Sequence, residues 1–397
     1  MRRERAAIAA GTVGNMTSEA TATGETDGSV LELFDAHLDL AYLELRRRNM
    51  LRPLDRLSED EVGPHPPASV TLPELARANV RYALGTVFTL PAEAGDADAD
   101  GADGAGRPEA YEAGDVEGAQ NAGVDQLDVY RRWADAGLCT IATRGSFETT
   151  SAGEAAGAGA APLLRIGVLV ENADPIRTPD ELDMWIDRGV VAISLTWARQ
   201  GRYAAGNLVA SDGVNPGLTA MGVELLEAME EEKVVLDVSH LNDASLDDAL
   251  SRFGGRGGRV IASHSNCRAL VGEGDGVRDQ RHLTDETIVE IGRRDGVIGL
   301  NLCAAFIERG ADERNRPSMD AAAAHVERIC ELTGSTRHVG LGSDLDGGFS
   351  AARLPRGIDR AADMGKLLGV LGERGFSRAD VEAFASGNWL RVLSRRD

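Results

Sequence analysis

With 397 residues, 43% of them hydrophobic, the chain is long for one average domain but has a size that α/β barrels reach without dividing, and its apolar runs are too short to cross a membrane. Its formal net charge of −22 argues against nucleic-acid binding, because phosphate contacts need clustered basic residues and Lys233 and Lys366 are the only lysines. We therefore expect neither nucleic acid nor a membrane as a partner.

Residues 1–28 are rich in Thr, Ala, Glu and Gly, which predicts a disordered tail ahead of a single domain over 29–397. No apolar stretch follows Arg2 and Arg3, as a secretory signal would require, so we expect a cytoplasmic protein. A homodimer is compatible with the sequence. Four cysteines without CxxC spacing lie in or beside apolar segments and are expected as buried small hydrophobic residues: Cys139, Cys267, Cys303 and Cys330.

Short apolar runs rich in β-branched residues recur along the chain and predict eight strands, over residues 31–34, 80–90, 163–170, 190–196, 234–238, 260–262, 297–302 and 338–341. Between several of them, apolar residues at three- and four-residue spacing predict helices over 221–232, 245–253, 285–294 and 319–333. Thr284 and Ser377 are helix start signals, the latter for a helix over 380–393. The alternation predicts an α/β fold, a (β/α)₈ TIM barrel, with a doubly wound open sheet as the alternative.

The segment over 92–120 interrupts this alternation. It is dominated by Gly, Ala, Asp and Glu, so we expect a mobile acidic loop that leaves the second strand at the catalytic end of the barrel. An inert surface insertion and a lid are both compatible with this composition.

Metal-binding residue types follow five of the predicted strands. Catalytic groups of such barrels lie at the C-terminal ends of the strands, and His37 and Asp39, two residues apart, point the same way on an extended chain. A lone His or Asp at a strand end more often has a structural role, but such a role does not explain why six potential ligands lie at strand ends. The candidates for a metal site are His37, Asp39, Glu171, His240, His264 and Asp344. The remaining histidines receive no metal role: His65, His282, His325 and His338.

These segments resemble the membrane (renal) dipeptidase family of the amidohydrolase superfamily, from about Leu31 to Leu393. The matching motifs are Asp-Ala-His-Leu-Asp at 35–39, Asp-Val-Ser-His at 237–240, Ile-Ala-Ser-His-Ser-Asn at 261–266, Gly-Ser-Asp-Leu-Asp-Gly at 342–347 and Gly-Asn-Trp-Leu-Arg at 387–391. The resemblance implies a dipeptidase with two Zn²⁺ ions, other divalent metals being compatible, that cleaves small dipeptides by a metal-bridged hydroxide. Substrates with a D-residue at the C-terminal position are included.

Carried over residue by residue, the resemblance implies that His37 and Asp39 hold one zinc ion, that His240 and His264 hold the other and that Glu171 bridges them. Asp344 would be the general base. Asp346 matches as well, and we favour a structural role for it. Related enzymes that bridge their metals with a carboxylated lysine have it at the end of the fourth strand, where this chain has Ser-Leu-Thr-Trp at 194–197.

Arg281 resembles the family arginine that binds the terminal carboxylate of the substrate, a task suited to its guanidinium fork, although a solvated loop arginine is the alternative. Trp197 stands where vertebrate members have a substrate-binding histidine, and an indole N–H donates one hydrogen bond but carries no proton. Arg199 or Arg202 would then supply positive charge. Two other readings stay open: an amidohydrolase acting on a lactone, an acylamino acid or a cyclic amide, and a non-catalytic binding barrel.

Overall fold

The computed structural model describes residues 31–92, 107–143, 147, 163–211, 217–255, 257–272, 274, 276 and 278–394. The tail predicted over 1–28 lies outside the described residues. All eight predicted barrel strands are confirmed, with the first shifted towards His37 and most of the others shortened: β1 (Leu33–Leu38), β2 (Val80–Val87), β6 (Leu164–Val170), β7 (Val190–Ser194), β8 (Val235–Asp237), β9 (Val260–Ala262), β10 (Val297–Leu300) and β11 (Val339–Leu341).

These strands form a closed parallel barrel. The hydrogen-bonded order runs β2-β1-β11-β10-β9-β8-β7-β6, and β2 pairs with β6 from Tyr82↔Arg165 to Val87↔Val170, which closes the ring. The predicted TIM barrel is therefore confirmed, and the open-sheet alternative is wrong. Since all strands are parallel, their C-terminal ends meet at one mouth of the barrel.

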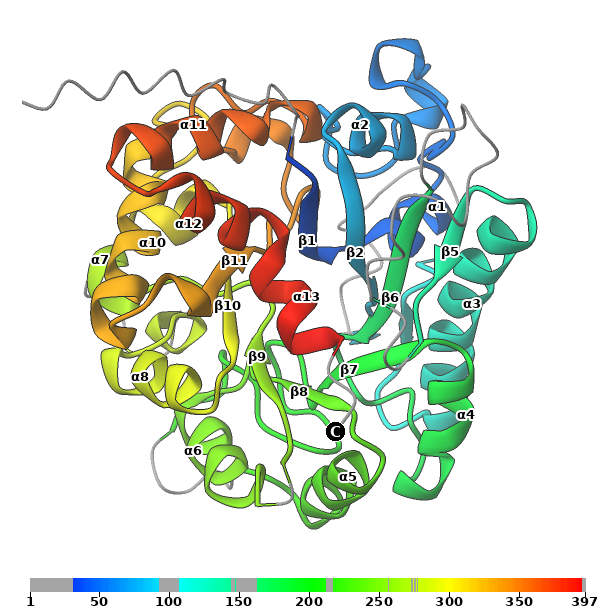
Figure 1. The fold of residues 1–397 in the computed structure, drawn as a ribbon. Coiled ribbons are helices and arrows are strands. Elements are labelled where there is room, and N and C mark those ends of the chain that lie inside the picture. The colour runs from blue at the N-terminus through cyan, green and yellow to red at the C-terminus, as the bar shows by residue number, and fades with distance from the viewer. Residues whose placement is uncertain are drawn as a thin grey trace, which may run out of the picture. The chain divides into compact units, whose positions relative to one another are not determined.

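Helices surround the barrel in Figure 1 and follow most strands: α1 (Leu40–Leu45), α2 (Leu72–Arg77), α3 (Val116–Asp135), α4 (Leu182–Asp187), α5 (Ala220–Glu231), α6 (Asp243–Arg252), α7 (Arg268–Val271), α8 (Asp285–Arg293), α9 (Ala304–Ile307), α10 (Met319–Thr333), α11 (Gly365–Glu373), α12 (Arg378–Glu382) and α13 (Asn388–Leu393). Side chains cap several of them, as the predicted start signals require. Thr284 accepts from the N–H of Thr287, and Ser377 accepts from that of Asp380. The helix predicted over 380–393 is divided by a π turn at Ala383–Gly387.

Helix α13 closes the barrel at the N-terminal ends of the strands. It lies across the barrel in Figure 1, and its Trp389, which is fully buried, packs in one apolar cluster with Phe34, Leu169 and Ile261 of the strands. The indole N–H of Trp389 donates to the carbonyl of Leu341 over 3.0 Å. This end is therefore filled by apolar packing, which leaves the opposite mouth for polar chemistry.

The prediction of a loop over 92–120 is wrong for its second half, while residues 93–106 lie outside the described residues. Strand β3 (Leu90–Ala92) pairs with β4 (Ala110–Glu112), and α3 begins at Val116 behind the capping side chain of Asp115. Small side chains account for the packing, because Ala119 is fully buried although the segment as a whole is acidic. A further strand that the sequence did not indicate, β5 (Cys139–Ile141), pairs with the start of β6.

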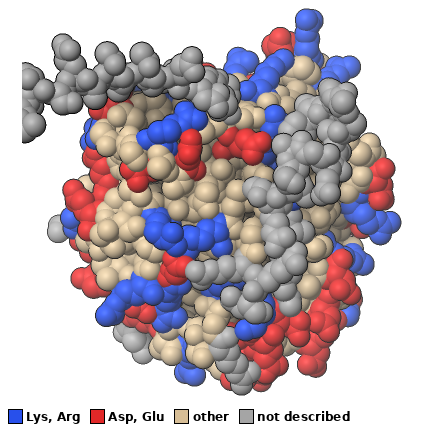
Figure 2. All heavy atoms as spheres, in the orientation of Figure 1, with Lys and Arg blue, Asp and Glu red and all other residues tan. Residues whose placement is uncertain are grey.

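Charged side chains of both signs are interspersed on the face of the molecule in Figure 2. Among the described residues on the face in Figure 2, Lys and Arg form small groups separated by acidic and uncharged residues. All four cysteines are free, and Cys139, Cys267 and Cys303 are buried, as expected, while Cys330 is half-buried. Within the described ranges, no helix combines the length and apolar character needed to span a membrane.

Candidate metal centre

The end of β1 supplies two of the predicted site residues. His37 is the fifth residue of β1 and is fully buried. Asp39 lies between the end of β1 and the start of α1. His37 Nε2 and Asp39 Oδ1 lie 3.8 Å apart. The hydroxyl of Thr86, on the neighbouring strand β2, donates to the same carboxylate oxygen of Asp39. The strand end thus presents an imidazole and an oriented carboxylate side by side.

Glu171 lies at the centre of the site, directly after β6, where its N–H donates to the carbonyl of Val87 over 3.0 Å. One carboxylate oxygen, Oε1, faces three imidazole Nε2 atoms, at 3.6 Å for His37, 3.2 Å for His240 and 3.7 Å for His264. The other oxygen, Oε2, is buried and has no hydrogen-bond partner among the described residues. Glu171 is therefore the residue around which the three histidines converge.

His240 and His264 follow β8 and β9. His240 adopts a left-handed backbone conformation with φ 68°, which is rare for a residue with a side chain and typical of functional sites. Its Nδ1 lies 3.0 Å from Oδ1 of Asn207, and an amide oxygen only accepts, so Nδ1 carries the proton. The Nε2 atom of His240 then faces Nε2 of His264 at 2.9 Å.

The donor set fits a divalent metal centre. Burial lowers the pKa values of His240 and His264 well below the ordinary range, so both rings are neutral and present lone pairs. Facing lone pairs and the unpartnered buried atoms His37 Nε2 and Glu171 Oε2 call for a cation between them. Described residues form three groups of potential ligands within 4.8 Å: His37, Asp39 and Glu171; Glu171, His240 and His264; and His37, Asp237 and His264.

Three acidic side chains in one buried space carry unfavourable charge without a cation. Burial raises the pKa of Glu171 to about 8 and that of Asp344 to about 8, while burial together with the charge of Glu171 raises the pKa of Asp39 to about 6. A bound divalent ion reverses this effect, because it favours the ionised carboxylates.

Asp344 lies after β11 with φ 60°, and its N–H donates to the carbonyl of His37 over 3.2 Å. A tight turn fixes it, because a Cβ at Gly347 would lie 1.8 Å from Oδ1 of Asp344. The other carboxylate oxygen, Oδ2, accepts from the side chain of Asn301 over 2.9 Å. The structure thus brings Asp344 to the same mouth as the histidines.

Asp346 lies apart from this cluster. It is fully buried, forms an ion pair with Arg48 and accepts from the backbone N–H groups of Ser69, at 2.8 Å, and Val70, at 3.0 Å. These contacts attach the loop after α1 to the end of β11, which agrees with the structural role favoured for Asp346.

Arg281 ends the 3₁₀ helix Arg278–Arg281 and is 5% exposed, so the alternative of a solvated loop arginine is wrong. Its guanidinium donates to the carbonyl of His264 over 2.9 Å and to Oγ of Ser265 over 3.2 Å, and it lies 5.0 Å from the ring centroid of Phe306. The buried Nε atom has no partner within the described part of the chain. Arg281 therefore keeps a free donor beside the site.

Trp197 borders His240, with ring centroids 5.9 Å apart, and packs edge-on against Phe88 at 5.3 Å. Arg202, in contrast, donates to three backbone carbonyls, those of Asp174, Ile176 and Arg177. Its guanidinium holds a loop together, and a role for Arg199 or Arg202 in supplying positive charge to the substrate site stays a prediction.

The sequence did not single out the side chains that support this site. Thr86, Asn207 and Asn301 each donate to or accept from a predicted site residue, yet each is a common residue type that follows no ligand motif. Thr86 lies near the end of β2, Asn301 directly follows β10 and Asn207 lies in the loop between β7 and α5. Closeness to the C-terminal ends of the strands was the one available signal, because these ends meet at one mouth.

A (β/α)₈ barrel that gathers imidazole and carboxylate groups at the C-terminal ends of its strands is typical of metal-dependent hydrolases. The chain belongs to the membrane dipeptidase family, peptidase family M19, whose family model matches residues 29–397. It is accordingly an enzyme of the metallodipeptidase class, and the resemblance noted in the sequence is confirmed.

Individual relatives are distant. An uncharacterized protein encoded beside pqqA in Klebsiella pneumoniae is 28% identical over 216 residues, 54% of this chain and 74% of that protein. The dipeptidase aclJ of Aspergillus oryzae is 28% identical over 212 residues, 53% of this chain and 46% of that protein. An uncharacterized dipeptidase of Schizosaccharomyces pombe is 28% identical over 218 residues, 54% of this chain and 49% of that protein. The matched region thus spans about half the length of these two dipeptidases.

Solved structures share the fold over nearly the whole chain. The crystal structure of dipeptidase AC, a family M19 metallopeptidase, aligns with a TM-score of 0.70 and 20% identity over 92% of this chain and 99% of that one. A metallopeptidase from Rhodobacter sphaeroides, bound to a phosphinate mimic of the dipeptide L-Ala-D-Ala, aligns with a TM-score of 0.70 and 21% identity over the same shares. At these identities the comparison supports the fold alone.

Proposed function

We propose that this chain hydrolyses the peptide bond of small dipeptides with a centre of two divalent metal ions, zinc in the first instance. The observation that carries the proposal is the convergence of three imidazole Nε2 atoms on one carboxylate oxygen of Glu171, at 3.2 to 3.7 Å. His37 and Asp39 would hold one ion, His240 and His264 the other, and Glu171 both. Two such ions lower the pKa of a water molecule and polarise the scissile carbonyl.

Asp344 is proposed as the general base. It is buried at the same mouth, and the charges of His37, Asp39 and Glu171 all act on its pKa, which supports a role beside the proposed metal ions. The hydrogen bond from Asn301 leaves Oδ1 of Asp344 to take a proton from the attacking water and to deliver it to the leaving amine.

Arg281 is proposed to bind the terminal carboxylate of the substrate. Its fork is held by the backbone and side chain of the segment that carries His264, so its free Nε donor lies beside a proposed metal ligand. Among the residues that the structure describes, no carboxylate forms an ion pair with this buried guanidinium, so an anionic substrate group would match it. Trp197 lines the edge of the site beside His240 and contributes an apolar face and one N–H donor.

Substrates with a D-residue at the C-terminal position belong to this proposal, supported by the Rhodobacter sphaeroides metallopeptidase that binds a mimic of L-Ala-D-Ala. Hydrolysis of an acylamino acid is a second candidate, because Arg281 would recognise its carboxylate equally well. A cytoplasmic location and a homodimer remain predictions.

The test is a panel of L,L- and L,D-dipeptides, their C-terminal amides and matched N-acyl amino acids. The protein is assayed as purified, after chelation and after zinc is restored. We expect dipeptide hydrolysis that chelation abolishes, zinc restores and amidation weakens. Hydrolysis confined to acylamino acids would favour the second candidate, and full activity in the chelated protein would contradict the metal centre.

A further inference from the structure

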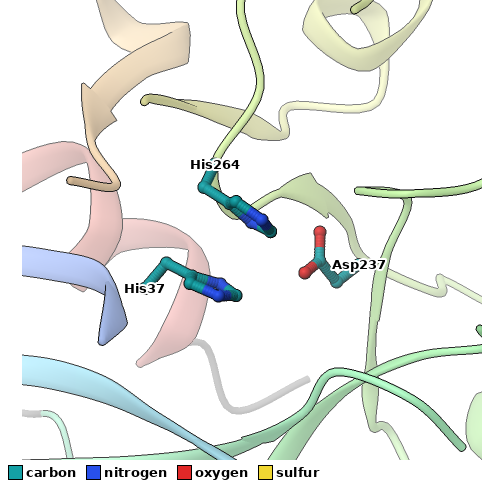
Figure 3. A group of neighbouring side chains, drawn as sticks. All are labelled: His37, Asp237 and His264. Carbon is teal, nitrogen blue, oxygen red and sulfur yellow. The ribbon is translucent and has the colours of Figure 1, made fainter. Parts of the chain in front are cut away.

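One of the three groups of potential ligands already surrounds a hydroxyl. Figure 3 shows the rings of His37 and His264 side by side, with the carboxylate of Asp237 facing them. The rings stack at 3.5 Å between centroids and 28° between planes. The hydroxyl of Ser263 lies 2.6 Å from Asp237 Oδ2, 2.8 Å from His264 Nδ1 and 3.1 Å from His37 Nδ1. A longer contact of 3.4 Å joins it to the hydroxyl of Ser239.

The chemistry of a hydroxyl fixes the direction of these contacts. A serine hydroxyl supplies one proton and accepts two hydrogen bonds, whereas an ionised carboxylate only accepts. The short contact to Asp237 therefore takes the hydroxyl proton, and both Nδ1 atoms must donate to the hydroxyl oxygen. An imidazole that is neutral and protonated at Nδ1 has its lone pair at Nε2, and Nε2 of both rings faces Glu171.

We propose that Ser263 is a positioning residue for both halves of the metal centre, setting the Nδ1–H form of His37 and of His264 through a single hydroxyl. In the proposed function, on which this inference rests, His37 is a ligand of one ion and His264 a ligand of the other. One side chain therefore prepares a ligand for each ion, and the two ions share one support.

Rigid surroundings hold the hydroxyl in place. Oδ1 of Asp237 accepts from the backbone N–H groups of Ser263, at 2.8 Å, and of Ser239, at 3.0 Å, so the carboxylate cannot turn away. The backbone carbonyl of Ser263 lies between Gly299 and Gly342, where an added Cβ would come within 1.8 Å of it at either glycine. The backbone carbonyl of Ser263 is thus enclosed by two residues without side chains, which fixes the backbone from which the hydroxyl projects.

The remaining histidine has a support of its own. His240 donates from Nδ1 to Asn207 over 3.0 Å. Among the residues that the structure describes, Asn207 forms no hydrogen bond with the stacked rings of His37 and His264. Replacing Asn207 should therefore disturb one ion, while replacing Ser263 should disturb both. This contrast separates a shared support from a general loosening of the site.

Zinc binding tests the proposal without recourse to activity. The wild type, Ser263→Ala and Asn207→Ala are stripped of metal and titrated with Zn²⁺ against a chromogenic chelator, with metal counted per folded chain. We expect Ser263→Ala to weaken both binding steps by about 10- to 100-fold and Asn207→Ala to weaken one. Ser263→Thr, which keeps the hydroxyl, should restore most of the affinity. Unchanged binding of either ion by Ser263→Ala would overturn the proposal.

Ser194→Ala is the matched control. Ser194 is also a buried serine at a strand end, but its hydroxyl donates its one proton between two backbone carbonyls, those of Ser239, at 2.8 Å, and Thr196, at 3.1 Å. The zinc affinity of Ser194→Ala should equal that of the wild type. If Ser194→Ala lost as much affinity as Ser263→Ala, any buried hydroxyl at this mouth would have the same effect, and the proposal would be overturned.

The protonated nitrogen can be observed directly in the wild type, so the test does not depend on whether a variant folds. In protein labelled with ¹⁵N-histidine, the rings of His37 and His264 should carry their proton at Nδ1, with and without zinc. A proton at Nε2 of either ring would overturn the proposal. A chain that binds zinc but cleaves no dipeptide would overturn the proposed function and leave this inference standing. If the chain binds no zinc, the position of the ring protons of His37 and His264 still tests the role of Ser263.

Discussion

The side-chain amide of Asn301 donates a hydrogen bond of 2.9 Å to Oδ2 of Asp344, while its own oxygen accepts from the N–H of Cys303 at 2.7 Å. The second contact fixes which way the amide faces, because only the oxygen can accept. Asp344 is therefore held by a donor whose orientation the backbone sets, as expected for a proton-transferring group.

Asp344→Asn should lower kcat by about 10²- to 10⁴-fold while leaving the metal content unchanged, because the amide has the shape of the carboxylate but cannot take a proton. Steady-state kinetics on a cleaved dipeptide, together with metal analysis of the same sample, check this prediction. Retained kcat would show that another group transfers the proton.

Without bound metal, the folded protein should become less stable as the pH rises. Burial raises the pKa values of Glu171 and Asp344 to about 8, so between pH 6.5 and 8 the folded metal-free chain holds protons that the unfolded chain has released. Its free energy of unfolding should then fall as the pH rises, by up to about 1.4 kcal/mol per pH unit for each carboxyl. Histidines oppose this trend only in part, because burial lowers the pKa values of His240 and His264, while unfolded histidines are about half protonated at pH 6.5 and largely neutral by about pH 7.5.

Thermal unfolding at pH 6.5 and pH 8, with and without zinc, measures this slope. Zinc should remove it, because bound metal keeps the carboxylates ionised, and zinc binding at pH 7 should release protons into the buffer. A metal-free protein that becomes more stable between pH 6.5 and 8 would contradict the burial of these protonated groups.

Arg281→Lys should raise KM for dipeptides about 10- to 100-fold, since a charge-assisted hydrogen bond contributes about 1.5 to 3 kcal/mol and an ammonium lacks the guanidinium fork. The C-terminal amide of the same dipeptide is the control substrate. If Arg281 binds the carboxylate, amidation should cost the wild type much more than the variant. Equal losses in both proteins would assign the carboxylate to another residue.

Asp346→Asn should destabilise the fold without removing metal. The variant leaves Arg48 buried without a charged partner, and breaking a buried ion pair costs about 3 to 5 kcal/mol of unfolding free energy. Chemical denaturation measures the loss. If folded Asp346→Asn instead bound fewer metal ions than the wild type, Asp346 would belong to the metal centre.

The barrel could be predicted because its strands are short apolar runs that alternate with helical patterns, and metal-binding residue types follow five of them. Parallel strands then place His37, Glu171 and His264 at one mouth whatever the loops between them do. The same reasoning could not find Ser263 or Asn301, because a serine or asparagine at a strand end has many structural uses and its partners come from other strands.

The segment over 110–120 shows the opposite limit. Its acidic composition predicted a loop, yet Asp115 caps α3 and Ala119 is fully buried. Composition averages over a window and misses the start of a helix whose first buried residues are small, namely Ala119, Ala122 and Gly123.

Metal content with and without Glu171 tests the central claim most directly. The wild type and Glu171→Gln, both folded by circular dichroism, are reloaded with zinc, freed of excess metal and analysed for zinc per chain and for dipeptide hydrolysis. We predict two zinc ions and hydrolysis in the wild type, and in Glu171→Gln fewer bound ions with kcat/KM reduced at least about 100-fold, because the carboxylate faces all three histidines. A variant that keeps both ions and full activity, or a wild type that binds no metal, would contradict this metal centre.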